Sequence, residues 1–189
     1  MKRVLITFAC ILATLQVAAQ EHLAFKGEPI DGEVFSFVQK LNKLGFKSVQ
    51  KTDDGYYLEG LFSGHNSMLL VESSLISNTA HTVYVMHEVE EDWATLKRDY
   101  YVLKKGLTLK YGNPIQSKEE FRSPYKEGDG YAYMAFKGGH ADWQCRFDAK
   151  VGIIDLYIRE QSYGELNVIL KYEDSANVKK AVQELTSDL

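Results

Sequence analysis

Apolar side chains recur every three or four residues in three long segments of this 189-residue chain, a spacing that places them on one face of a helix. The pattern predicts helices over residues 32–44, 92–110 and 175–189. The middle segment has the clearest stripe, made of Trp93, Leu96, Tyr100, Leu103 and Leu107. Residues that commonly cap helices precede two of the segments: Asp31 before the first, and Asp174 or Ser175 at the third.

Shorter segments alternate between apolar and polar residues, which is the pattern of a strand with one buried face. The predicted strands cover residues 46–52, 56–62, 67–72, 81–88, 131–136, 143–148, 153–160 and 166–172. Residues 113–130 are polar, and we expect a long connection there. These elements predict an α+β fold: an antiparallel sheet with helices packed on one face.

Two short motifs occur twice in the chain. Lys43-Leu44-Gly45 ends the first predicted helix, and Lys110-Tyr111-Gly112 ends the second. A phenylalanine followed by glycine and histidine then marks a predicted hairpin in each half, at residues 62–65 and 136–140. The matching order predicts two degenerate helix-plus-strands units, about 25–90 and 91–174, followed by the helix 175–189 within a single domain, 21–189.

The first twenty residues have the layout of a signal peptide. Lys2 and Arg3 precede an apolar run over residues 4–17, and the small residues Ala18 and Ala19 lead into a polar segment. The run is shorter than the roughly 20 residues that span a bilayer. We therefore predict cleavage near residue 20 or 21, export to the periplasm or the extracellular space, and no transmembrane segment in the mature chain.

The charge and cysteine content narrow the classes of partner and fold. Without residues 1–20, the 26 acidic side chains outnumber the basic ones by six, which argues against a nucleic-acid partner. Cys145 is then the single cysteine, so no internal disulfide is possible. It alternates with Trp143 and Phe147 along a predicted strand, and we expect a buried thiol.

Motifs for catalysis or metal binding are weak. The chain contains no Gly-x-Ser-x-Gly nucleophile turn and no glycine-rich phosphate loop. His65 and His140 hold matching places after the repeated glycines and would bind zinc only if the two hairpin tips met. We expect no cofactor and keep this histidine pair as the alternative metal site.

Aromatic residues are the stronger candidates for a binding surface. The chain has 12 tyrosines, and tyrosine is common at recognition surfaces because its large ring carries a polar tip. Phe121, Tyr125 and Tyr163 lie in polar connections, and Tyr131 and Tyr133 belong to the adjoining predicted strand. These five residues are the predicted partner-binding set.

Tandem helix-plus-antiparallel-strand units behind a signal peptide resemble the beta-lactamase-inhibitor-protein-like fold. That resemblance implies a concave sheet offered to a partner protein, although such inhibitors usually carry disulfides, which the mature chain lacks. The signal ending in Ala19-Gln20 is similar to those of uncharacterised exported proteins of Gram-negative gut anaerobes.

Two functional hypotheses follow. The first is an exported, non-enzymatic binding module that contacts a protein, peptide or glycan through a sheet face and its loops. The alternative is a small periplasmic hydrolase or metal-dependent enzyme whose site forms only in three dimensions.

Overall fold

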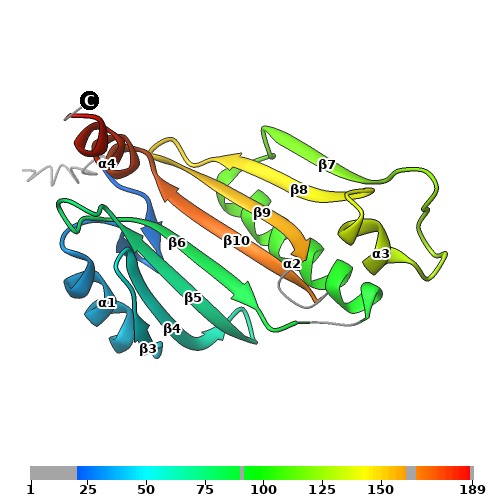
Figure 1. The fold of residues 1–189 in the computed structure, drawn as a ribbon, viewed down its shortest axis with the longest axis horizontal. Coiled ribbons are helices and arrows are strands. Elements are labelled where there is room, and N and C mark those ends of the chain that lie inside the picture. The colour runs from blue at the N-terminus through cyan, green and yellow to red at the C-terminus, as the bar shows by residue number, and fades with distance from the viewer. Residues whose placement is uncertain (1–20, 90–91, 161–164, 188–189) are drawn as a thin grey trace, which may run out of the picture.

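A computed structural model describes residues 21–89, 92–160 and 165–187 (Figure 1). The helices are α1 (Val34–Lys43), α2 (Trp93–Tyr111), α3 (Ala132–Lys137) and α4 (Ser175–Thr186). The strands are β1 (Ala24–Phe25), β2 (Glu28–Pro29), β3 (Lys47–Lys51), β4 (Gly55–Phe62), β5 (His65–Ser73), β6 (Ala80–His87), β7 (Gln116–Phe121), β8 (Ala141–Asp148), β9 (Gly152–Glu160) and β10 (Leu166–Asp174). The predicted α+β class, with helices packed on an antiparallel sheet, is confirmed.

Eight strands form one antiparallel sheet in the order β3-β4-β5-β6-β10-β9-β8-β7, and β1 and β2 form a separate small ribbon. The fold consists of two halves. Each half contains a long helix, α1 or α2, and the four strands of the large sheet that follow it in the chain. The last strands of the halves, β6 and β10, pair in the centre, where Val85 lies opposite Leu170. This pairing merges the two halves into one sheet.

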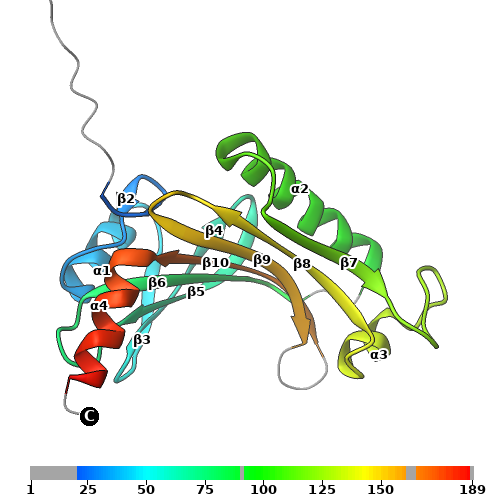
Figure 2. The same cartoon turned by 90° about the horizontal axis from the view of Figure 1, so that it is seen from above.

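The main core lies between α1, α2 and one face of the sheet. Leu58, Leu69, Val85, Leu170 and Leu156 lie opposite one another on neighbouring strands and are fully or almost fully buried on this face. Figure 2 shows the long strands bending, with α2 on the outside of the bend. The helix α4 instead contacts β6, β9 and β10 near the C-terminal end of β10.

The two predicted helix caps have different outcomes. Asp174 accepts a hydrogen bond from the backbone N–H of Asn177 at 2.9 Å and caps α4, as predicted. At α1 the prediction of Asp31 is wrong, because Glu33 is the cap and its carboxylate accepts from the N–H of Ser36 at 3.0 Å. The carboxylate of Asp31 is bonded instead to the amide of Asn177.

Residues 113–130 are not one long connection, because they contain the strand β7. Most of its residues are polar, as is common in an edge strand, and one of its core-side residues, Glu119, is surrounded by hydrogen-bond donors. The Glu119 carboxylate accepts hydrogen bonds from the hydroxyls of Tyr100 and Tyr101, each at 2.9 Å, and from Lys104. A polar residue with several donors around it can therefore occupy an inward position.

The predicted strand over 131–136 is also wrong, because residues 132–137 form the helix α3. A segment of six residues is too short to distinguish the periodicity of a helix from that of a strand. Tyr133 and Phe136 fit the spacing of a helix, whereas Tyr131 and Tyr133 fit the alternation of a strand. Packing decides the outcome. The Phe136 ring lies 5.6 Å from the ring of Trp93 and 6.3 Å from that of Trp143.

Burial of Cys145, Trp143 and Phe147 is confirmed, since all three side chains face the core from β8. The Cys145 thiol is free, and burial raises its pKa. A thiol that stays protonated inside the core is a poor nucleophile. The structure therefore assigns this cysteine a packing role.

Replacing Leu170 with alanine at the central strand pair should lower the free energy of unfolding by about 3 kcal/mol, because it leaves a cavity in the core. Leu109→Ala serves as the control, since Leu109 is 80% exposed on α2 and its loss should cost less than about 0.5 kcal/mol. Equilibrium unfolding in urea measures both. Equal effects of the two substitutions would contradict this account of the core.

Candidate functional site

The face of the sheet opposite α1 and α2 carries a second set of apolar and aromatic side chains. Tyr57, Met68, Met86, Ile169 and Tyr157 occupy the alternate positions of five adjacent strands, from β4 to β9. Ile169 is almost fully buried, whereas the side chain of Met68 is 39% exposed. We call this surface the open face.

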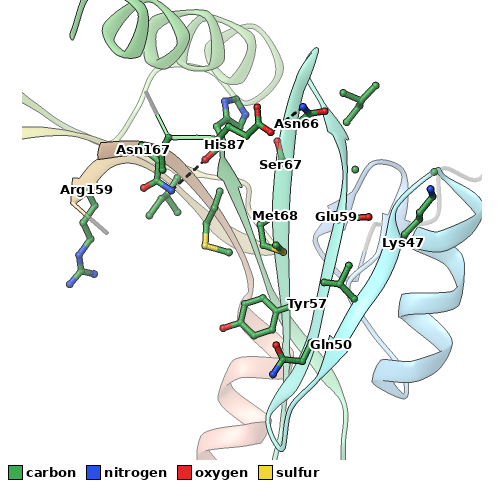
Figure 3. A pocket seen from close by; sticks show the side chains of 18 of the residues that line it. Lys47, Gln50, Tyr57, Glu59, Asn66, Ser67, Met68, His87, Arg159 and Asn167 are labelled. Atoms are coloured by element: carbon green, nitrogen blue, oxygen red, sulfur yellow. Dashed lines mark hydrogen bonds between the residues drawn. The ribbon is translucent and has the colours of Figure 1, made fainter. Parts of the chain in front are cut away.

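A groove of about 1250 Å³ crosses the open face from β3 to β9 (Figure 3). Met68, Met86 and Ile169 are apolar residues that line it, and Tyr57 and Gln50 lie next to each other at one end. Lys47 on β3 and Arg159 on β9 lie on opposite sides of the groove. A second hollow, of about 540 Å³, lies along β7, β8 and β9.

Asn167 lines the groove and is almost fully buried. Its side-chain N–H donates to the backbone carbonyl of His87 at 3.4 Å, whereas its Oδ1 atom has no hydrogen-bond partner among the described residues. A buried acceptor without a donor costs about 1–3 kcal/mol. The groove thus contains a polar group that its own neighbours do not satisfy.

Two pairs of opposite charges lie on the open face. Arg146 of β8 binds Asp155 of β9 through two hydrogen bonds of 2.6 and 2.9 Å. Lys171 of β10 pairs with Glu173, and its ammonium lies 5.7 Å from the centre of the Tyr84 ring. These pairs leave the apolar floor of the groove accessible while keeping the central charges compensated.

Partial burial perturbs the ionisation of groups on this face. Desolvation raises the pKa of the Glu72 carboxyl above its usual value, and it raises the pKa of the Tyr157 hydroxyl as well. Both shifts have the same cause, since a half-buried group loses part of the hydration of its charged form. Both groups are therefore harder to ionise than the same groups in water.

A histidine pair lies behind one end of the groove, on the core side of the sheet. The rings of His65 and His87 stack with centroids 4.8 Å apart, and Asp99 of α2 lies 3.7 Å from His65. Burial is the main cause that lowers the pKa of His87 to about 4, and the neighbouring His65 adds to it, although Asp99 acts in the opposite direction. His87 is therefore neutral at neutral pH.

The structure places the two histidines of the alternative metal site in different surroundings. His65 belongs to β5 and stacks on His87, whereas the ring of His140 lies 5.5 Å from the ring of Tyr125. Residues 63 and 64 form a tight turn with positive φ angles of 51° and 88°, so His65 is a strand residue and not a loop tip. Among the described residues, no group of three or more His, Cys, Asp or Glu side chains could hold a metal ion.

Four of the five predicted partner-binding residues are described by the structure, and none of these four lines the groove. The Phe121 ring packs 4.9 Å from Trp143 in an aromatic cluster, and the half-buried Tyr133 donates a hydrogen bond to Glu160 at 3.3 Å. Tyr131 is 60% exposed, Tyr125 is half-buried beside His140, and Tyr163 falls outside the described residues. A binding role for these five residues stays a prediction.

Sequence reasoning missed the groove because its residues come from six strands and share no motif. One signal was present. Tyr57, Met68 and Met86 are large apolar residues at strand positions that alternate with the core side chains, where solvent-facing strands usually carry polar groups.

Comparison with known proteins gives no match: no family model, no curated protein and no solved structure matches this chain. Within the described residues, no helix combines the length and the hydropathy that crossing a membrane requires.

Lowering the pH from 6.5 towards 4 should destabilise the fold through His87. In this range the unfolded chain takes up a proton on His87, with a pKa of 6.5, and the folded chain does not, since its pKa is about 4. The unfolded state then binds more protons, so stability falls with the pH, by about 3 kcal/mol over the full range.

Urea unfolding at a series of pH values measures this contribution. His87→Phe keeps a ring in the stack and should remove most of the acid sensitivity between pH 6.5 and 4, whereas the control His140→Phe should retain it. Identical pH profiles for the original protein and His87→Phe would show that another group is responsible.

Proposed function

We propose that this protein is an exported binding module that engages a protein, peptide or glycan partner through the open face. The observation that carries the proposal is the groove of about 1250 Å³ with an apolar floor on a sheet face that α1 and α2 leave uncovered. The layout of residues 1–20 supports export.

The composition of the groove supports a binding role. Methionine side chains adapt their shape to different contacts, and both Met68 and Met86 line the groove. Tyr57 adds a large ring with a polar tip, and the amides of Gln50, Asn66 and Asn167 supply hydrogen-bonding groups. A groove of this kind, apolar with a few polar groups, is typical of recognition sites.

The sheet also provides a rigid platform. Every strand that lines the groove is hydrogen-bonded to its neighbours, and the opposite face is packed against the core. A preorganised surface loses little conformational entropy when a partner binds. The likeness to the beta-lactamase-inhibitor-protein-like fold stays a prediction beside this proposal.

Site-specific photo-crosslinking in the cells that make the protein tests the proposal. Benzoylphenylalanine at position 68 should crosslink a discrete partner, because Met68 is exposed in the groove. The same group at position 109 is the control, since Leu109 is exposed on α2 away from the open face.

The substitution Met68→Glu should then weaken binding of the purified partner by about tenfold or more, because it places a charge on the apolar floor, whereas Leu109→Glu should leave the affinity unchanged. Crosslinks from position 109 alone, or equal effects of the two substitutions, would move the binding surface away from the open face.

A further inference from the structure

The strand β3 forms one edge of the sheet and one wall of the groove. It pairs with β4 on one side only, and all five of its residues are exposed. Among the described residues, no strand pairs with the backbone N–H and C=O groups on its outer side. Such an edge can accept a further strand from another chain.

The two lysines of β3 lack acidic partners. Among the described residues, neither Lys47 nor Lys51 forms a salt bridge; Glu59 lies opposite Lys47 in the strand register without pairing with it. The ammonium of Lys51 lies 5.7 Å from the centre of the Tyr56 ring. The edge therefore presents two cations whose charges are available to a partner.

The opposite edge of the sheet differs, because the charges of β7 are used within the protein. Lys118 lies 2.6 Å from Asp142 and 3.3 Å from Glu120, and Glu119 is bonded to Lys104 and to two tyrosines. Closed pairs of this kind leave β7 with little charge to offer. Of the two edge strands of the large sheet, β3 is therefore the one whose lysines form no salt bridge among the described residues.

Exposed apolar side chains surround the lysines. Val49 is 48% exposed at the centre of β3, where the register with β4 shifts, and Leu61 on β4 is 64% exposed. Both residues line the groove next to Lys47. A strand bound along β3 would cover this apolar surface while its charged side chains met the lysines.

We propose that β3 binds an extended peptide segment with acidic side chains, which adds a strand to the sheet and directs alternate side chains over the groove. This inference rests on the proposed function and names the partner chemistry of the same face. Backbone pairing supplies the affinity, and the lysines together with the groove select the sequence.

The same lysines disfavour a second copy of this chain as the occupant. In an antiparallel pair of two β3 strands, the lysines of both copies would gather along one shared edge, and this accumulation of like charge would destabilise the pairing. Charge repulsion between lysines therefore disfavours pairing with a second β3 strand, whereas charge attraction favours an acidic segment. Both effects contribute to specificity.

Selection from a display library of random peptides, long enough to run along all of β3, tests the inference with the purified protein as bait. We expect enrichment of peptides that combine apolar residues with acidic residues on both faces of the strand, because the register shift in β3 places Lys47 and Lys51 on opposite faces of the sheet. A synthetic peptide of the enriched sequence should bind about tenfold more weakly to the double variant Lys47→Glu/Lys51→Glu, and more weakly as the salt concentration rises. The charge-matched control Lys105→Glu/Lys110→Glu, on α2, should bind as the original protein does.

Hydrogen exchange provides the readout for strand addition, because bound peptide should protect backbone amides of β3. Binding that is insensitive to the β3 charges, or protection confined to β9 and β10, would overturn the inference while leaving the open face as a binding surface. If no peptide is enriched but position 68 still crosslinks a partner, the inference about β3 is likewise overturned and the open face remains a binding surface. Association of the protein with anionic lipid vesicles through these lysines, without peptide binding, would assign the edge to a membrane surface and also overturn the inference.

Discussion

The antiparallel pairing of β6 and β10 is the constraint on which the rest of the structure depends. Each is the last strand of its half, and their pairing turns two four-stranded sheets into one sheet of eight. The first five residues of β10, Leu166–Leu170, are all buried, as expected for a strand at the centre of a wide sheet. Without this pairing, each half would expose a long apolar edge.

The one-sided arrangement of helices has a consequence for the other face. Ile169 and Asn167 lie on the open face and are nevertheless buried, although neither α1 nor α2 covers that face. An apolar surface of this size needs protection from unspecific association. The pairs Arg146–Asp155 and Lys171–Glu173 provide it, since they place compensated charge across the middle of the face.

Sequence periodicity predicts the elements well where they are long, and poorly where burial is mixed. The stripe over residues 92–110 locates α2 to within one residue at each end, since every turn repeats the same signal. The strand β7 and the helix α3 were missed because Glu119 is satisfied by distant partners and Phe136 packs on distant rings. The groove could not be predicted from the sequence because it also depends on distant contacts. Tyr57 and Arg159 line the same groove only because of the order of the strands in the sheet.

The two halves share an order of elements but differ in the connection that follows the outer strand and in the pairing of the outer strand's charges. In the second half, α3 lies between β7 and β8, and the charges of the outer strand are tied to α2 and β8. In the first half, residues 52–54 join the outer strand β3 to β4, and within the described part of the chain the lysines of β3 form no salt bridge and lie beside exposed apolar groups. The groove begins at this edge and crosses the central seam as far as β9, and no residue of β7 lines it. The two outer strands therefore differ both in the pairing of their charges and in their position relative to the groove, although the two halves share an order of elements.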